Sequence, residues 1–143
     1  MKKIYSIITI SIISLFLIVS CSIMPGTGSN QLSGTTWKLI SYAGNNPLPG
    51  KNMTASFDTK EIRGSASCNS YFGSYQLKGD RISIGELGWT EMACLDPEGI
   101  MEQEQAIMKL LSESSSFSIQ GDRLQITTSS GDLLIFQQLI GID

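Results

Sequence analysis

The fold is decided by the stretch Gln76-Leu77-Lys78-Gly79-Asp80-Arg81-Ile82-Ser83-Ile84, which predicts two strands joined by a tight turn. Glycine adopts positive φ angles without strain, so Gly-Asp between two alternating apolar and polar runs is a strong hairpin signal. The same pattern recurs over Ser118–Ile126, around Gly121-Asp122. Either Gly-Asp is simply a good hairpin turn, which is the interpretation we prefer, or the two hairpins are related.

Further short alternating runs lie on both sides of these hairpins and are separated by turn residues. They predict strands at Thr35–Ile40, Thr54–Phe57, Ile62–Ser67, Tyr71–Leu77, Arg81–Ile84, Ser116–Gln120, Arg123–Ile126 and Leu133–Gln138, with a proline-containing loop over 44–50. Strands that recur every roughly 8 to 12 residues with glycine turns are typical of an antiparallel barrel or sandwich.

One helix is predicted between the two hairpins. Asp96–Glu98 resembles a helix start, because aspartate caps, proline suits the first helical position and glutamate favours the positive end of the dipole. An apolar stripe follows at Ile100, Ile107 and Leu111. We expect this stripe to pack on the sheet or to plug an open barrel end. A partner-binding groove or a membrane-lying face is the alternative, although the glutamates of the helix disfavour an anionic membrane.

The first 20 residues have the pattern of an export signal. Two lysines precede an apolar run over residues 7–19, which is short for a membrane span, and the run ends in Leu17–Cys21. This end resembles the lipobox of bacterial lipoproteins, in which the cysteine receives lipid (diacylglycerol and, in many bacteria, a further acyl chain such as palmitate). We therefore expect removal of the signal peptide 1–20 and lipid attachment at Cys21. An uncleaved helical anchor and ordinary signal cleavage nearby are the alternatives.

The expected location is the cell envelope, with the protein anchored to a membrane by its lipid. Residues 21–31 contain Pro25 and several glycines and predict a flexible tether to a folded domain over 32–140. Ser22 follows the cysteine, and by resemblance to Gram-negative lipoproteins the absence of aspartate there permits outer-membrane sorting, facing the periplasm.

Charge and composition exclude several function classes. Without Lys2 and Lys3 the chain has 8 basic and 13 acidic residues, a net charge of −5 (8 − 13), so a nucleic-acid backbone would be repelled. There is no histidine, which excludes a Ser-His-Asp mechanism and removes the commonest zinc ligand. We expect no cofactor and no metal.

Two cysteines remain in the predicted domain, Cys68 and Cys94. In an oxidising compartment such a pair usually forms a disulfide, and closing a loop of about 27 residues would stabilise the fold by roughly 3 to 4 kcal/mol. A redox or metal pair is the weaker alternative, because the spacing is not Cys-x-x-Cys.

Two glutamates raise the question of whether the protein is a hydrolase. Glu86 and Glu91 flank Trp89, and a glycosidase would need two carboxyl groups a few ångströms apart in a cleft. Because no set of nucleophile and base is present, we expect no catalytic residues and no enzymatic activity.

Several motifs together resemble the META domain family. They are Trp37-x-Leu39, Gly64-x-x-x-Cys68-Asn69-x-Tyr71-x-Gly73-x-Tyr75, Thr90-x-Met92-Ala93-Cys94, Gly121-Asp122-x-Leu124 and Gly131–Phe136. The resemblance covers about residues 33–138, and only Ser67 departs from the pattern, where the family often has glycine.

The resemblance implies an α+β domain, with a strongly curved antiparallel sheet or partial β-barrel and one packed helix. It also implies an HslJ-like envelope lipoprotein linked to heat or drug stress, such as novobiocin tolerance, without an established active site. We interpret Asn69 as a turn former that bonds its own backbone, and Tyr71 and Tyr75 as cross-sheet packing on one strand face. The alternative is that these three residues form a binding surface.

The expected partners are the membrane, through the lipid, and an envelope protein; the protein itself is expected to be a monomer. Binding or structural support in the envelope is our first functional hypothesis. The alternative is an inhibitor or assembly helper that captures one envelope protein, or an acyl chain inside the barrel.

Overall fold

The computed structural model describes residues 30–139. The signal peptide, Cys21 and most of the predicted tether lie outside the described residues. The elements in chain order are β1 (Thr35–Tyr42), β2 (Thr54–Phe57), β3 (Glu61–Ser65), β4 (Ser70–Lys78), β5 (Arg81–Trp89), α1 (Ile100–Ser112), β6 (Ser114–Gln120), β7 (Arg123–Thr128) and β8 (Leu133–Gln138). Over residues 30–139, no helix has the length and hydropathy of a membrane span.

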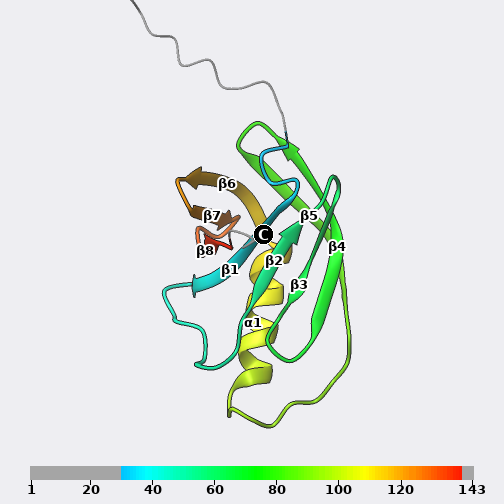
Figure 1. Cartoon of the computed structure of the whole chain (residues 1–143), viewed down its shortest axis with the longest axis vertical. Coiled ribbons are helices and arrows are strands. Elements are labelled where there is room, and N and C mark those ends of the chain that lie inside the picture. Colours follow the sequence, from blue (N-terminus) through cyan, green and yellow to red (C-terminus); the bar gives the residue numbers. More distant parts are fainter. Residues whose placement is uncertain (1–29, 140–143) are drawn as a thin grey trace, which may run out of the picture.

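The eight strands form a closed antiparallel barrel in sequence order (Figure 1). The expected partial barrel is therefore wrong in this respect: β8 pairs with β1 and completes the wall, with Trp37 opposite Gln138 and Tyr42 opposite Leu134. A bulge between Leu39 and Ser41 lies in this seam. Bulges increase strand twist and bend the bulged strand, which favours closure of a short sheet on itself.

The predicted strands are all present, because alternation and glycine turns are local signals. The main difference is β5, which continues to Trp89 rather than ending near Ile84. The predicted helix start was also wrong. Helix α1 begins at Ile100 after Gly99, which has a φ of 84° and provides no side-chain cap. A turn in which the Ile100 N–H donates to the Pro97 carbonyl precedes the helix, and the helix begins where Ile100 becomes buried.

The barrel interior is occupied by the protein's own side chains. Trp37, Leu39, Ile62 and Leu124 are almost fully buried there, and α1 contributes its apolar face, which confirms the prediction of a core helix.

One glycine in the wall allows two strands and an aromatic side chain to meet. A β-carbon at Gly64 would overlap the Thr54 carbonyl oxygen and lie 2.9 Å from Cε1 of Tyr71. Gly64 and Tyr71 are directly opposed across β3 and β4, and the Tyr71 hydroxyl donates to the Thr54 carbonyl oxygen at 2.9 Å. The missing side chain is what allows this approach, as when aromatic residues cover glycines in other sheets.

The barrel has one weakly paired seam. β4 and β5 are joined by seven residue pairs, but β5 and β6 are joined by one, Arg81 with Ser116. Figure 1 shows that the chain after β5 runs along the outside of the barrel to its lower end and returns through α1. Helix α1 packs against β5.

Candidate functional site

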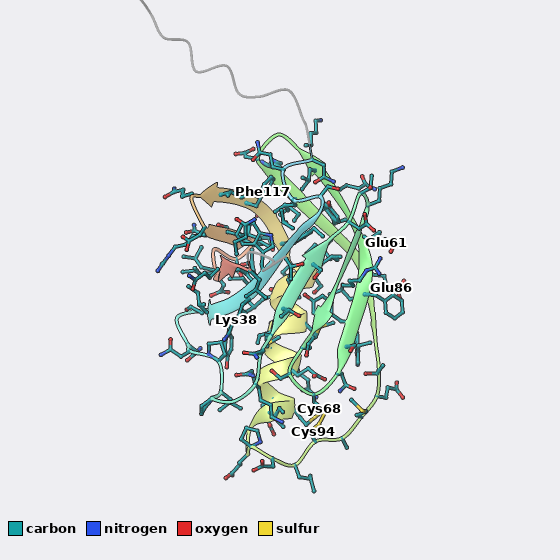
Figure 2. All side chains as sticks on the ribbon, in the orientation of Figure 1. Lys38, Glu61, Cys68, Glu86, Cys94 and Phe117 are labelled. Atoms are coloured by element: carbon teal, nitrogen blue, oxygen red, sulfur yellow. A yellow bond between two sulfur atoms is a disulfide. The ribbon has the colours of Figure 1, made fainter. Side chains whose placement is uncertain are left out.

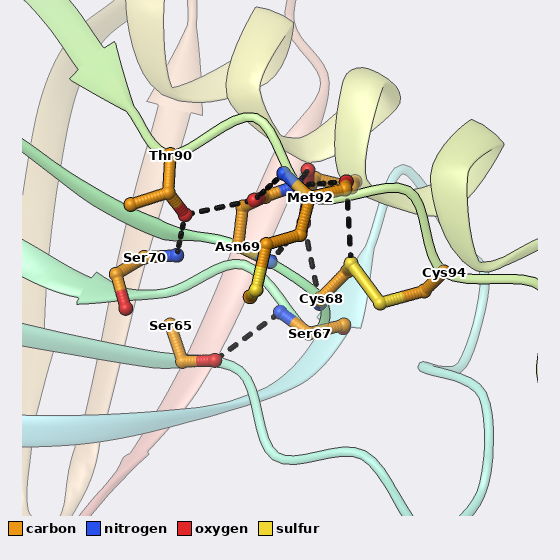
Figure 3. Close-up of a disulfide and its surroundings, with 9 residues drawn as sticks. Ser65, Ser67, Cys68, Asn69, Ser70, Thr90, Met92 and Cys94 are labelled. Carbon is orange, nitrogen blue, oxygen red and sulfur yellow. Dashed lines mark hydrogen bonds between the residues drawn. A yellow bond between two sulfur atoms is a disulfide. The ribbon is translucent and has the colours of Figure 1, made fainter.

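Asn69 lies at the lower end of the barrel, between β3 and β4, and is only 2% exposed. Its Nδ2 donates to the Met92 carbonyl oxygen at 3.0 Å and to Oε1 of Glu104 at 2.6 Å. Its Oδ1 accepts from the Thr90 hydroxyl and from the Met92 N–H, each at 2.7 Å. The predicted turn former bonding its own backbone is therefore wrong. Asn69 joins the segment after β5 to helix α1 (Figure 3).

Glu104 completes this network from the helix. Its buried carboxylate accepts from the backbone N–H groups of Cys68 and Asn69 at 3.2 and 2.8 Å, as well as from the Asn69 amide. Hydrogen bonds to an ionised acceptor are stronger than neutral ones, and three donors compensate the carboxylate for the water it has lost. The Glu104 carboxylate therefore stabilises the contact between α1 and the β3–β4 turn.

The Cys68–Cys94 disulfide is present beside Asn69. Figures 2 and 3 show it at the lower end of the barrel, near the beginning of α1. It connects the β3–β4 turn to the segment that follows β5, so it reinforces the same joint as Asn69. The two motifs that carried the family resemblance, around Cys68 and around Cys94, are therefore one structural unit.

Ser67 precedes this unit with a φ of 96°, a conformation in which glycine is favoured. This conformation fits the glycine that the family resemblance implied at this position. In this chain the Ser67 hydroxyl accepts a hydrogen bond from Nε2 of Gln103 at 2.9 Å, and Oε1 of Gln103 accepts from the Leu48 N–H at 2.6 Å. Gln103 therefore ties the 44–50 loop to the same joint.

Tyr71 and Tyr75 are 2% and 3% exposed, so they are interior packing residues. Burial raises the pKa of Tyr71 well above its ordinary value and also raises the pKa of Tyr75. The Tyr75 hydroxyl donates to the Asp58 carbonyl oxygen and its ring packs edge-on against Phe57. Cross-sheet packing describes both residues. Tyr71 and Tyr75 therefore do not form an exposed surface, whereas Asn69, although only 2% exposed, lines the groove described below.

An open groove of about 760 Å³ lies between α1 and the end of β5. One wall is Gly85–Trp89 of β5, and the segment Thr90–Ala93 closes one end. The other wall is a single stripe of α1, composed of Met101, Gln105, Met108, Lys109 and Ser112. The apolar part of the lining includes exposed Trp89 and Met92 and buried Leu87 and Met108.

Glu86 and Glu91 both line this groove. The structure thus brings the two predicted carboxylates to one cleft together with Glu104. Both are exposed, whereas Glu104 is held by its three N–H donors. Within the described part of the chain no cluster of three or more metal-ligating side chains occurs.

Sequence reasoning missed the groove and two of its supports, Gln103 and Glu104. A signal for them exists, because they lie three and four residues after Ile100 and so fall on the apolar face of α1. A polar residue in an apolar stripe predicts a buried hydrogen-bond partner. The groove itself depends on how far β5 extends past β6, and no local pattern encodes that.

The protein is a small closed β-barrel with one inserted helix. The Cys68–Cys94 disulfide, Asn69 and Glu104 connect the β3–β4 turn to the helix and to the segment that follows β5. Residues 30–139 match the family model of the META domain, so this chain belongs to the META domain family. No match was found among curated proteins.

Solved structures share this fold. An NMR structure of a protein from Burkholderia xenovorans is 28% identical, covers 77% of this chain and 85% of its own, and superposes with a TM-score of 0.63. A second NMR structure is 24% identical, covers 78% and 94%, and has a TM-score of 0.62. A crystal structure of a duf4847 family protein from Bacteroides vulgatus is 11% identical, covers 75% and 94%, and has a TM-score of 0.56. The last two support the fold alone.

Proposed function

We propose that this protein is a non-catalytic binding domain of the cell envelope, held at a membrane by lipid on Cys21, that contributes to tolerance of heat or of drugs such as novobiocin. The observation that carries the binding role is the open groove between α1 and β5. Its volume of about 760 Å³ lies within the range of roughly 300 to 1,000 Å³ found for ligand pockets.

The bracing of the groove supports a binding role over a purely structural one. The Cys68–Cys94 disulfide, Asn69 and Glu104 all act on the segment that forms its closed end. A preorganised wall lowers the ordering cost of binding, because the wall does not have to be fixed by the ligand. A non-catalytic role fits two observations: the sequence has no histidine, and the Glu104 carboxylate accepts hydrogen bonds from the backbone.

The lipid anchor is tested by the intact mass of protein extracted from membranes of its host. We expect the mass of a chain without residues 1–20. We expect it to be raised by two or three acyl chains and lowered by the two hydrogens lost on disulfide formation. Protein recovered with its leader, or without fatty acid in the aqueous fraction, would contradict the anchor.

The binding role is tested by complementation of a deletion strain exposed to heat, detergent and novobiocin. Gln105→Trp would place an indole in the groove from an exposed helix position. Glu102→Trp is the matched control, because Glu102 is exposed on the same helix but does not line the groove. We expect the control and the wild-type protein to restore tolerance and Gln105→Trp to fail. No phenotype on deletion would remove the stress role, and full rescue by Gln105→Trp would remove the groove from it.

The second candidate is an inhibitor or assembly helper that captures one envelope protein. Exposed Trp89, Met92 and Leu95 favour it, because they place large apolar side chains at and just beyond the groove end. Crosslinking in intact cells from this segment, followed by identification of one specific partner, separates it from a role in small-molecule binding.

A further inference from the structure

We infer that the groove binds an extended, positively charged polypeptide segment of a partner protein, which adds as a strand alongside β5. This inference rests on the proposed binding function and specifies the class of ligand. Three observations carry it: the unpaired edge of β5, the size of the groove and the charge of the surrounding segment.

The free edge of β5 supplies the backbone partners. Within residues 30–139, β5 pairs with β6 only at Arg81 and Ser116, although it pairs with β4 as far as Trp89. A strand that pairs on one side turns every second N–H and C=O to the other side. Such an edge is a template for an incoming strand, and main-chain hydrogen bonds then provide affinity that does not depend on sequence.

The dimensions suit a short extended segment. The α1 stripe from Met101 to Ser112 spans about 16 Å at the helical rise of 1.5 Å per residue. An extended chain rises about 3.3 Å per residue, so the groove accommodates about five residues. Alternate side chains of the added strand would face the apolar floor at Leu87 and Met108, and the others would face outward.

Charge selects the kind of segment. Residues 82–113 contain seven acidic residues and one basic residue, whereas the rest of the described chain contains five acidic and seven basic residues. The single cation, Lys109, lies 3.9 Å from the carboxylate of Glu113 and is thus partly neutralised. Opposite charges steer encounter and set specificity, so a ligand with basic outward-facing side chains is favoured.

The charge of the groove favours a protein segment over a membrane surface or over the chain's own tether. The acidic segment would be repelled by anionic lipid, and residues 22–31 contain no basic side chain.

The test uses the protein as processed by its host, purified in a neutral detergent. The probe is a peptide of alternating lysine and valine, about as long as the free edge of β5. Its controls are the alternating glutamate and valine peptide, and the lysine peptide with alternate backbone amides methylated. Tryptophan fluorescence reports binding, because exposed Trp89 lines the groove whereas Trp37 is buried in the barrel, and hydrogen exchange of residues 82–89 reports strand addition.

We expect the lysine peptide to bind, to protect β5 amides and to bind less tightly as salt is raised. Glu86→Gln combined with Glu91→Gln should weaken binding by about two- to thirtyfold, the range for loss of two exposed charge pairs. Asp122→Asn, in the β6–β7 turn, is the control and should change affinity by less than about twofold.

Equal binding of the methylated peptide would overturn strand addition, and equal binding of the glutamate peptide would overturn the charge argument. If neither peptide binds while the neutral dye Nile red still binds, as its own emission reports, and Gln105→Trp abolishes that binding but Glu102→Trp does not, the peptide inference fails and the binding function stands. If neither the peptides nor the dye bind, both fail.

Discussion

Two seams of the same barrel have opposite properties. Between β8 and β1 the strands pair over most of their length, and the wall is closed by backbone hydrogen bonds. Between β5 and β6 a single residue pair remains, and helix α1 packs against β5 beside this seam. The second seam is also where the disulfide, Asn69 and Glu104 gather. Where backbone pairing between strands is absent, side-chain hydrogen bonds and a disulfide stabilise the chain instead. A groove remains between α1 and β5.

This comparison implies that a substitution in the fully paired part of the barrel should lower the stability of the whole fold. A change at the β5–β6 seam, where the disulfide, Asn69 and Glu104 lie, should instead act mainly on the local stability of residues 90–99. Three substitutions and reduction of the disulfide test this division, in order of decreasing effect.

The largest effect is expected for Gly64→Ala, in the paired wall. The new β-carbon would overlap the Thr54 carbonyl oxygen, and the strand cannot move without breaking its pairing. We expect a loss of about 5 kcal/mol or a failure to fold, the upper range for single substitutions. Denaturant unfolding measures it. Gly131→Ala is the control: its φ is 94° and space around it is open, so only the conformational cost of about 1 to 2 kcal/mol applies. Similar values for the two variants would contradict the close approach at Gly64.

Loss of the disulfide should be second. The Cys68–Cys94 bond spans 26 positions, and in the chain-entropy model its removal costs about 3 to 4 kcal/mol. Treatment with dithiothreitol should lower the free energy of unfolding by this amount and increase hydrogen exchange in residues 90–99 before the barrel strands. The Cys68→Ser, Cys94→Ser double variant should not respond to the reductant. Uniform loss of protection across the barrel would show that the seam is not a separate unit.

Asn69→Ala should cost about 3 kcal/mol, because it removes four side-chain hydrogen bonds of roughly 0.5 to 1.5 kcal/mol each, of which solvent can replace some. The loss should appear in chemical denaturation, together with faster exchange at Met92, whose N–H loses its acceptor. Asn45→Ala is the matched control, since that exposed amide has one long bond to the Ala43 carbonyl oxygen. Equal effects at the two positions would argue against the role of Asn69 in the seam.

The smallest effect is expected for Tyr71→Phe, which removes one hydrogen bond to the Thr54 carbonyl oxygen and should cost about 1 kcal/mol at neutral pH. Burial raises the pKa of Tyr71 above that of an unfolded tyrosine, about 10. The contribution is fully present below pH 10 and is lost as pH rises further, because the unfolded state then releases the proton first. Wild-type stability should therefore fall more steeply above pH 10 than that of Tyr71→Phe. Parallel curves in alkaline titration of unfolding would contradict burial of the hydroxyl.

Part of the candidate site could be predicted from the sequence. Cys68 and Cys94 pair because the domain has no other cysteine in its described part, and the family motifs around them meet in space. The interpretation of Asn69 was wrong, because its four partners come from Thr90, Met92 and Glu104, which are distant in sequence. Glu86 and Glu91 were found by residue type, but only the fold shows that they share a groove lined by α1.

The sequence by itself determined the strands, the glycine turns between them and the buried face of the helix, since side-chain period and turn preference act over a few residues. Closure of β8 on β1, the free edge of β5 and the start of α1 at Ile100 were decided only in the tertiary structure. Each depends on register and burial between segments far apart in the chain, and a strand's alternation is the same whether its edge is paired or open.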